Sequence, residues 1–383
     1  MKLRKANALI FVLGLIFASS IIAVSIVEHA SRTLKTRASS VCQQELRTQA
    51  YSALYASLAV LSEYHEIDKN LYSAKQGWEK PLDDKRIEFD DGTTAEVVIS
   101  DESGKLPLSD LNATELTAIF EEMDISTNDA QEMASCIIDW SDNNTASLVD
   151  GAEQDDYEDD RPKPPNRPIQ SFDEFRYIEK VRDVFFDENG EPTEAFKTFQ
   201  KGISLEHFDR VNLNSASPET LKMMLDIEDK DYEDDLYDAL QGKTGMVSDG
   251  IVWVKNLAEL QERTSAEVPS KRSVYTAQLL KIEITIKRGI GEYYLCAYYA
   301  NKRTVSAYDK KIKAVYTQQE DRQDTSTGGK MSSSVSTSAL SVKSAYVKMS
   351  DSIMGGGAKK TSASKVVKGD FQIIKIQERG DSQ

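Results

Sequence analysis

The sequence lacks helix-breaking residues over a long stretch near its amino end. No glycine lies between Gly14 and Gly77, and the first proline is Pro81. Glycine and proline are the residues that most disfavour a helix interior. Once a helix has begun in this region, no residue of either kind ends it before Gly77.

Cysteine and histidine are also scarce. Three cysteines, Cys42, Cys136 and Cys296, are too few and too scattered for a disulfide framework or a zinc site. We interpret Cys42 and Cys136 as small buried apolar residues. The three histidines are isolated, and neither Gly-x-Ser-x-Gly nor His-Glu-x-x-His occurs. We therefore expect the chain not to be an enzyme, and an envelope-anchored hydrolase is the weaker alternative.

Positive charge is the third deficit. The 383 residues carry 47 Lys and Arg against 63 Asp and Glu, a net charge of −16. Affinity for nucleic acid depends on a basic face that neutralises phosphates, so we expect no nucleic-acid partner. The length allows two or three domains, and 40% hydrophobic residues suffice for their cores.

The amino end is basic and then apolar. Three cations in Met1–Lys5 are followed by Ala6–Val27, which holds no charge. This run is long enough to cross a bilayer as a helix, and the basic flank would stay cytoplasmic. A cleavable secretory signal has a similar pattern. Against that alternative, the apolar run is long, and Ser25–His29 continues it without a small-x-small cleavage site.

The helix is predicted to continue far beyond the membrane. From Ala8 to about Ile67 it would measure about 90 Å at 1.5 Å per residue. Apolar residues recur near a 3.6-residue period, and the stripe packs on the protein's own sheet, on partner subunits, or on both. Its residues are Leu34, Ala38, Val41, Leu46, Ala50, Ala53, Leu54, Leu58 and Leu61.

Helical and β patterns alternate along the rest of the chain. Thr94–Ile99 and Tyr275–Ile286 alternate as strands do, and Glu292–Tyr299 and Ser306–Tyr316 continue a meander. The intervening block is helical, with starts at Asn112 (Glu115 completing a capping box), near Thr127, at Ser171 and at Pro218. Because neither β segment alone buries a face stably, we expect one sheet interrupted by an insertion.

The predicted fold is therefore α+β: a long amino-terminal helix on an antiparallel sheet, with a large all-α domain inserted between strands. The sheet and helix take residues 28–100 and 268–317, and the inserted domain takes residues 101–267. Residues 318–383 are rich in Ser, Thr, Gly and Lys. We predict them to be a low-complexity, largely disordered tail, with Val366–Ile376 as one weak terminal strand.

An acidic stretch interrupts the helical block. Nine carboxylates and no cation lie between Asp139 and Asp160. Such a run is either a solvated loop or the oxygen-rich ligand set that calcium takes. Asp142 and Asn144 offer clustered side-chain oxygens, and Gly151 permits a tight turn that returns Asp150 and Glu153 to the same place. Both interpretations remain open from the residues alone.

Several motifs resemble one family. Arg4–Ile10 is similar to a type IV prepilin leader, cut between Ala6 and Asn7 to leave residues 1–6 as leader and residues 7–27 as the transmembrane part of the helix. Most pilins have Glu five residues after the cut, and this chain has Phe11. In lacking this Glu, the chain resembles the minor pseudopilins called type II secretion system protein K.

Three further segments carry the same resemblance. Ile138–Tyr157, containing Asp-Trp-Ser-Asp-Asn-Asn and Gly-Ala-Glu, is similar to the family's Asp-Trp-x-Asp-x-Asp and Gly-Ala-Glu-x-x-Tyr signature, with Asn144 replacing its second Asp. Val211–Leu221 resembles its Val-Asn-x-Asn-Thr-Ala-x-Pro-Glu-x-Leu segment, and Asp101–Asn112 resembles the start of its inserted domain.

The resemblance implies a function and a site. It implies a pilin-like fold and a minor pseudopilin of a type II secretion system. Such a subunit caps or initiates the periplasmic pseudopilus with other minor pseudopilins and helps to export folded proteins. The protein would span the bacterial inner membrane once, with its soluble domains in the periplasm, after processing by prepilin peptidase. It also implies calcium, with ligands carried over to Asp139, Asp142, Asn144, Asp150 and Glu153, and Trp140 anchors the helix end in the core.

Part of the Val211–Leu221 segment also resembles a different class of protein. Asn212–Ala216 also resembles helix-hairpin-helix proteins of the DNA-uptake class, in which a Gly-x-Gly hairpin presents backbone N–H groups to phosphate. Here Leu225–Asp229 stands where that hairpin belongs, and its carboxylates would repel phosphate. An envelope-anchored binding protein is the remaining alternative.

Overall fold

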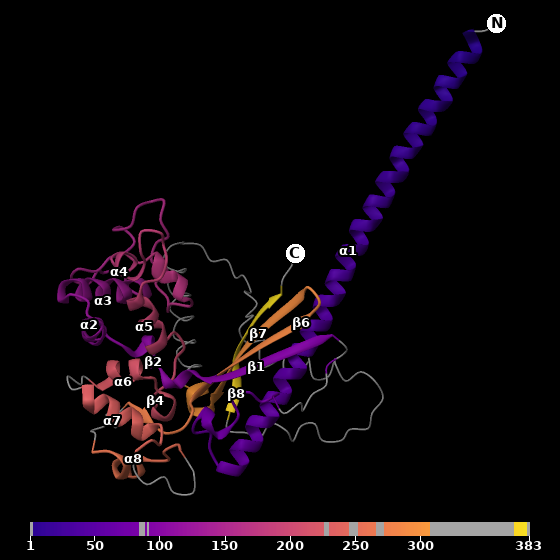
Figure 1. Ribbon diagram of the computed structural model, residues 1–383. Coiled ribbons are helices and arrows are strands. Elements are labelled where there is room, and N and C mark those ends of the chain that lie inside the picture. The colour runs from indigo at the N-terminus through magenta and orange to yellow at the C-terminus, as the bar shows by residue number, and fades with distance from the viewer. Residues whose placement is uncertain are drawn as a thin grey trace, which may run out of the picture.

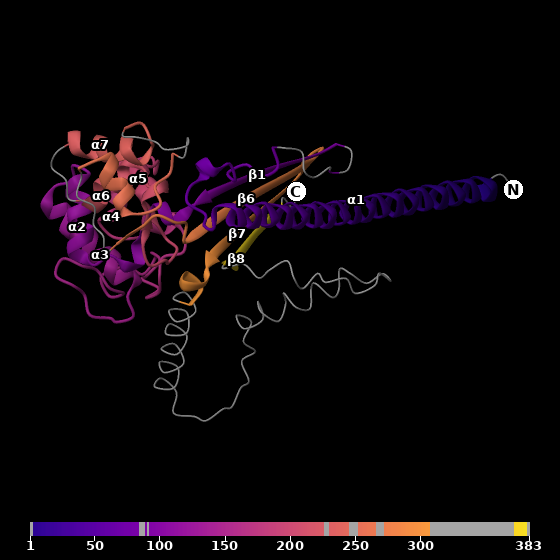
Figure 2. The ribbon, with the colours of Figure 1, turned by 90° about the horizontal axis from the view of Figure 1, so that it is seen from below.

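The computed structural model describes residues 3–83, 89, 92–225, 230–244, 252–265, 272–306 and 371–380. Figures 1 and 2 show a long helix, a sheet against one end of it, and a helical block beside that end. The helices are α1 Leu3–Asp68, α2 Ala113–Glu122, α3 Thr127–Ser141, α4 Val181–Phe185, α5 Glu194–Gly202, α6 Pro218–Leu225, α7 Lys230–Leu240 and α8 Leu257–Arg263. The strands are β1 Thr93–Asp101, β2 Leu106–Pro107, β3 Ile203–Ser204, β4 Val211–Asn212, β5 Ser273–Val274, β6 Leu279–Arg288, β7 Gly291–Asn301 and β8 Phe371–Gly380.

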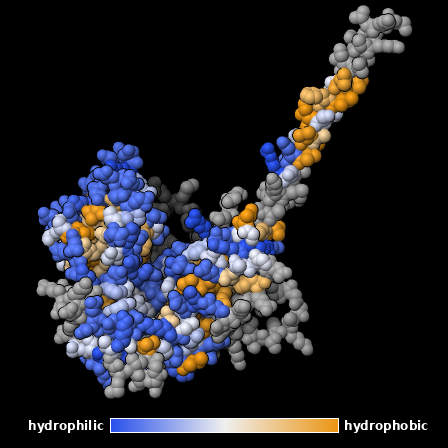
Figure 3. Space-filling model, viewed as in Figure 1, coloured by the Kyte–Doolittle hydropathy of each residue, from blue (hydrophilic) through white to orange (hydrophobic). Residues whose placement is uncertain are grey.

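Helix α1 is continuous, as the missing glycine and proline predicted. It contains one apolar segment long enough to cross a membrane, Val12–Thr33, which is not buried against any other part of the described chain. Figure 3 shows apolar surface on this projecting part of the helix, whereas the body of the molecule is mostly hydrophilic. By length and composition the segment fits a transmembrane anchor. Ala6 and Asn7 lie in the first turns of α1, and cleavage between them stays a prediction.

Four antiparallel strands form one sheet in the order β1-β6-β7-β8. Ile99 pairs with Ile282, and Ile284 pairs with Leu295, so that apolar side chains line the face turned toward α1. The mixed helix-and-sheet fold with an antiparallel sheet is confirmed. A register slip of one residue would turn these side chains away from the helix.

The apolar stripe of α1 packs on this sheet. Leu46, Ala50, Leu54 and Leu61 are buried in the core between helix and sheet, while Val41 is 58% exposed. From Leu46 onward the stripe therefore contacts the protein's own sheet. A partner subunit would have to contact another face of α1.

Strand β8 corrects the expectation for the carboxyl-terminal tail. Phe371–Gly380 pairs with β7, although residues 318–383 were assigned to a largely disordered segment. Within β8, Phe371 is buried and stacks on Tyr299 at 5.3 Å between ring centroids. The weak terminal strand predicted at Val366–Ile376 overlaps β8, which begins five residues later and continues to Gly380. The strand expected at Ser306–Tyr316 lies, apart from Ser306, outside the described residues.

The chain between β1 and β6 is mostly helical. It is not all-α, because β2 pairs with β3 and β4 pairs with β5 in two short parallel ladders. Residues 273–274 belong to the second ladder, so the main sheet resumes at Leu279 rather than at residue 268. A short parallel ladder needs partners distant in sequence, and no local pattern signals it.

Phenylalanine rings fill the centre of the helical block. Phe185 lies 5.1 Å from Phe196 and 5.2 Å from Phe199 between ring centroids. Phe175 lies 5.5 Å from Phe199. These rings join the segment around α4 to α5 and hold α2 and α3 above them through Phe120. The core of this block is separate from the core between α1 and the sheet.

Candidate functional site

Helix α3 positions the first candidate metal ligands. Ser126 caps its amino end by accepting a hydrogen bond from the N–H of Asp129 (3.3 Å), and Asp139 and Asp142 lie at its carboxyl end. The carboxyl end of a helix carries partial negative charge. Two carboxylates placed there are unfavourable unless a hydrogen-bond donor, a proton or a cation compensates their charge.

Asp139 is fully buried at this end. Its Oδ2 accepts a hydrogen bond from the N–H of Leu148 at 3.0 Å. Burial raises the pKa of Asp139, and the nearby Asp142 adds to the effect. A Cβ placed on Gly151 would lie 1.9 Å from Asp139 Oδ2, so that only glycine fits beside the carboxylate. The turn at Gly151 is therefore built around Asp139.

Glu153 is the second buried carboxylate. It is 4% exposed, and neither Oε1 nor Oε2 has a hydrogen-bond partner within the described part of the chain. Burial raises the pKa of Glu153, and the charges of Asp142 and Asp139 raise it further. A buried carboxylate without partners is costly. Proton uptake or a bound cation would remove that cost.

Asp142 and Asn144 lie nearer to solvent and bind each other. The backbone N–H of Asn144 donates to Asp142 Oδ1 at 2.9 Å, and its Nδ2 donates to Asp142 Oδ2 at 2.6 Å. Asp150 has a positive φ of 62°, and its backbone oxygen accepts from Cys136 Sγ at 3.7 Å. Its side chain is exposed.

The five predicted ligands therefore fall into two groups. Asp139, Asp142 and Glu153 lie close together, because the charge of Asp142 contributes to raising the pKa of both Asp139 and Glu153. Among the residues that the structure describes, no contact joins the carboxylate of Asp150 to this group. Within the described residues, no three Asp, Glu, His or Cys side chains converge tightly enough to hold a metal ion. Binding would require the loop after α3 to turn its oxygens inward.

Two polar residues of this loop take part in the candidate site but were not predicted from the pattern of carboxylates. Asn166 is buried, and its Nδ2 donates to the backbone oxygen of Asn144. Asp156 Oδ2 accepts from the N–H of Glu153 at 2.9 Å and from Ser147 Oγ at 3.2 Å. Asp156 stood in the acidic run, but no signal separated it from its neighbours. Asn166 lies among prolines, where no motif drew attention to it.

Trp140 has the predicted anchoring position. It is 3% exposed and packs on Tyr157 at 5.7 Å between ring centroids. Its Nε1 donates to Glu174 Oε2 at 3.4 Å. These contacts fix the end of α3 to the loop and to the segment before α4, and they leave the indole no role as a ligand.

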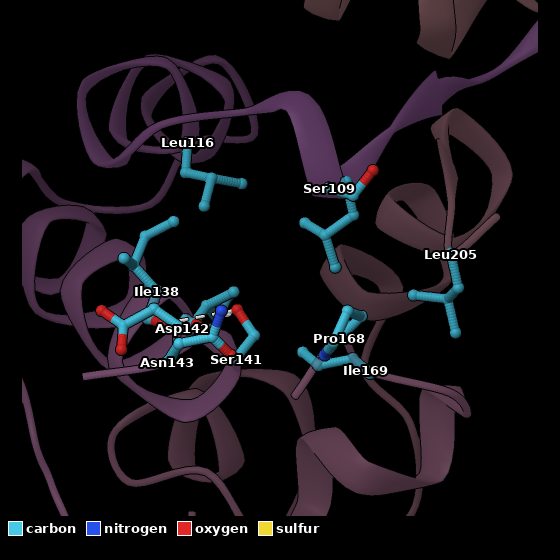
Figure 4. A pocket seen from close by; sticks show the side chains of 11 residues that line it. Ser109, Leu116, Ile138, Ser141, Asp142, Asn143, Pro168, Ile169 and Leu205 are labelled. Carbon is cyan, nitrogen blue, oxygen red and sulfur yellow. Dashed lines mark hydrogen bonds between the residues drawn. The ribbon is translucent and has the colours of Figure 1, made fainter. Parts of the chain in front are cut away.

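A cavity of about 300 Å³ opens beside the same end of α3. Figure 4 shows Leu116 and Ile138 on one side of it and Pro168, Ile169 and Leu205 on the other. Ser141, Asp142 and Asn143 contribute its polar wall. The cavity is apolar in most of its lining and holds no acid and base arranged as a pair.

Ser109, His207 and Asp110 lie together at the edge of this cavity. Ser109 Oγ and Asp110 Oδ1 both contact His207 Nδ1, each at 3.1 Å. A hydrolytic triad uses one ring nitrogen for serine and the other for the carboxylate. Because both partners share Nδ1, this trio does not have the geometry that activates a serine.

The Asn-x-Asn motif is a structural junction. Asn212 Nδ2 donates to Asp101 Oδ2 at 2.6 Å, which joins β4 to the end of β1. Asn214 Nδ2 donates to the backbone oxygen of Val254 at 2.7 Å, and the N–H of Val254 donates to Asn214 Oδ1 at 2.8 Å. Both asparagines are buried. The two asparagine side chains of the motif therefore make structural contacts, and residues 226–229 of the supposed hairpin lie outside the described chain.

Comparison with known proteins identifies part of the chain. Residues 99–187, from the end of β1 through α4, match the family model for the type II secretion system (T2SS), protein K. The match covers about a quarter of the chain, and over these residues the chain is similar to a type II secretion system component. The component it is similar to is protein K, the family whose resemblance the sequence motifs indicated.

A solved structure is also similar to the chain. It is that of the GspK-GspI-GspJ complex from the enterotoxigenic Escherichia coli Type 2 Secretion System. The sequences are 13% identical, the match covers 70% of this chain and 95% of that chain, and the TM-score is 0.47. No curated protein matches the chain in sequence.

Proposed function

We propose that this chain is a minor pseudopilin of a type II secretion system, and that it caps or initiates the periplasmic pseudopilus with other minor pseudopilins. It would thereby help to export folded proteins. The observation that carries the proposal is the protein K match over residues 99–187, in a chain whose apolar helix continues without a break into its folded body.

The anchor supports a single membrane crossing. Val12–Thr33 has 22 residues, about 33 Å of helix at 1.5 Å per residue, which matches the thickness of a hydrocarbon core. The cations of Met1–Lys5 would stay on the cytoplasmic side. The folded domains then lie in the periplasm, on the far side of the inner membrane, and prepilin peptidase cuts between Ala6 and Asn7.

The position of the helical block suits the end of a filament. In Figures 1 and 2 this block lies beside the end of α1 that is remote from the amino terminus. Subunits that bundle through their amino-terminal helices place this end furthest from the membrane. A pilin-like body with a wide inserted domain there obstructs further stacking, which is a reason for a place at the tip.

Partner subunits would contact the face of α1 turned away from the sheet. Thr48, Ser52 and Tyr55 are exposed on this face, while Ala50 and Leu54 face the protein's own sheet. Small side chains on a helix let another helix approach closely. We therefore place the contact with other minor pseudopilins on the Thr48–Tyr55 face and not on the apolar stripe.

Calcium is part of the proposal. The unpartnered oxygens of Glu153 and the buried Asp139 supply hard oxygen ligands of the kind that calcium takes. Asp142 and Asn144 could join them by a change of rotamer, and Asp150 by a movement of the loop. The ion would neutralise carboxylates at the end of α3 and hold the acidic loop on the helical block.

One experiment tests the proposed function. In a strain that lacks the chromosomal copy, the full chain should restore secretion of a folded exoprotein. A Thr48→Cys variant in a Cys42→Ser background should form cross-links to other minor pseudopilins. Ala50→Cys, buried against the sheet, is the matched control and should not. If the full chain did not restore secretion and no cross-link formed from the Thr48 face, the assembly model would be contradicted.

A second experiment tests the metal. Calcium should raise the melting temperature of the purified full chain in detergent, because the ion binds only the folded state. Glu153→Gln should abolish the shift, whereas Glu188→Gln, on an exposed turn, should leave it unchanged. An identical melting temperature with calcium and with chelator would remove the metal from the proposal.

A further inference from the structure

A third, small core joins the helical block to the sheet, on the face of the sheet turned away from α1. Phe208 is fully buried in this core and belongs to residues 206–209 of the block, between β3 and β4, which we call the seating segment. The buried strand residues of the core are Leu279, Cys296, Tyr298 and Ala300. Along β7 they alternate with Ala297 and Tyr299, which belong to the core with α1. The Phe208 ring therefore seats this segment on the outer face of the sheet.

An irregularity in β8 turns two consecutive side chains toward the same core. Ile373 pairs with Tyr299 and Lys375 pairs with Tyr298, so that Ile374 is an extra residue between two adjacent pairs. Such a bulge interrupts the alternation of side chains along a strand. Ile374 packs on the core, and Lys375 Nζ lies 5.1 Å from the centre of the Tyr298 ring. Strand β8 therefore brings a cation to the place where the seating segment lies.

Glu206 is the buried charge of the seating segment. It is 8% exposed, and among the described residues Lys375 is the cation that pairs with it. Asp209, at the other end of the segment, pairs with Arg303 at 2.5 Å, but Arg303 is exposed. A carboxylate buried without a compensating cation is costly. Without β8, seating of the Phe208 ring would bury Glu206 in that unfavourable state.

We propose that β8 is a clasp, which fixes the helical block on the sheet when Lys375 docks beside Glu206. Where the chain enters and leaves the block, its two crossings lie side by side, because the N–H of Gln278 donates to Ser103 Oγ at 2.9 Å. Adjacent crossings can act as a hinge, and the contact with β8 restricts movement about it. Since β8 follows residues 307–370 in sequence, the clasp closes after the rest of the body has been made. The clasp does not depend on the chain being a pseudopilin.

Two spin labels measure the angle between block and sheet in the full chain in detergent. One label is placed at Glu188→Cys, on the exposed turn after α4, and the other at Glu96→Cys, at an exposed position of β1. Cys42→Ser removes the half-exposed native thiol, while Cys136 and Cys296 are buried. With the clasp closed, we expect one narrow distribution of distances between the labels.

Lys375→Met should broaden this distribution. The variant keeps an apolar stem beside Tyr298 but leaves Glu206 without its cation, so that the seating segment moves toward water. Lys287→Met is the matched control, because Lys287 pairs with Glu292 at 3.1 Å on the exposed β6–β7 hairpin. It should leave the distribution narrow, and the far-UV circular dichroism of both variants should match that of the unaltered chain.

A double variant separates the clasp from a general weakening of β8. Glu206→Gln together with Lys375→Met leaves no charge to bury, so the distribution should become narrow again. If Lys375 only stabilised β8 itself, the double variant would be as broad as the single one. A double variant of that kind, or a narrow distribution in Lys375→Met alone, would overturn the proposal.

Discussion

Gly151 shows how a single residue shapes the acidic loop. Its α-carbon lies so close to Asp139 that an added Cβ would be 1.9 Å from Oδ2. The carboxylate is held in place by the N–H of Leu148 at 3.0 Å and cannot simply turn away. Glycine is required here because the Asp139 side chain lies so close, and not because the backbone adopts a left-handed conformation.

Gly151→Ala should therefore destabilise the fold by about 1–3 kcal/mol, the usual cost of overpacking. It should also weaken calcium binding, because the methyl group displaces Asp139. Urea unfolding with and without calcium measures both effects. Gly14→Ala, at a helical position with open space around it, is the control and should change neither. A stable variant with unchanged calcium response would show that Asp139 is not constrained as described.

Glu378 ties the last strand to α1. Burial raises the pKa of Glu378, but hydrogen bonds from Tyr51 and Arg47 outweigh this effect and hold the pKa below its usual value. The Arg47 Nε to Glu378 Oε2 distance is 3.2 Å. A carboxyl with a depressed folded pKa stabilises the fold above its unfolded pKa, about 4.3. This stability is lost as the pH falls through the folded pKa.

Glu378→Gln should cost about 1 kcal/mol at neutral pH, the scale of a hydrogen bond to a charged partner in a half-exposed position. The difference from the unaltered chain should shrink as the pH falls through the depressed folded pKa of Glu378, where its carboxyl becomes neutral. Urea unfolding across pH 3–7 measures it. Glu292→Gln, whose exposed partner is Lys287 at 3.1 Å, should show a much smaller difference. A difference that grows on acidification would have the wrong sign.

At the scale of elements, β8 completes the sheet. It pairs along nearly all of β7, and Phe371 contacts both Tyr299 and, at 6.2 Å, the ring of His65 on α1. The strand follows a long segment that lies outside the described residues. Contacts made by its side chains therefore hold β8 against the sheet and α1.

Phe371→Ala should destabilise the chain by about 3–5 kcal/mol, because it removes a buried ring from the core of helix and sheet. Gln372→Ala, at the exposed neighbour, should change the stability by less than 0.5 kcal/mol. Thermal unfolding followed by circular dichroism compares them. Equal behaviour of the two variants would mean that β8 contributes nothing to the sheet.

At the scale of the whole molecule, the apolar amino-terminal part of α1 extends from a strongly acidic folded body. The exposed Val12–Thr33 segment requires lipid or other helices, whereas a net charge of −16 keeps the folded part soluble. Membrane insertion should therefore precede contact with partner subunits.

Mature protein extracted from membranes should begin at Asn7, six residues shorter than the gene product. Mass spectrometry of the intact chain measures this. Ala6→Gly, which introduces the residue that such leaders normally carry, should leave the cut in place, and Ala6→Leu should block it. Membrane-assembled protein that retains Met1 would contradict the proposed leader.

Much of this architecture follows from local patterns. The missing glycine and proline predicted α1 to within a few residues, and Asn112 with Glu115 forms the predicted capping box, with both hydrogen bonds at 3.0 Å. Alternating apolar residues predicted β1, β6 and β7. These signals lie within a few positions of one another, which is why a sequence displays them.

Only the tertiary structure decided the contacts between distant segments. It placed β8 on β7, assigned Ser273–Val274 to the helical block, and joined Asn214 to Val254. It also buried Asp139 and Glu153 while leaving Asp150 exposed. The physical reason is that the sequence alone specifies residue type and local period. Burial, charge pairing and long-range strand order depend on which surfaces meet after the chain has folded.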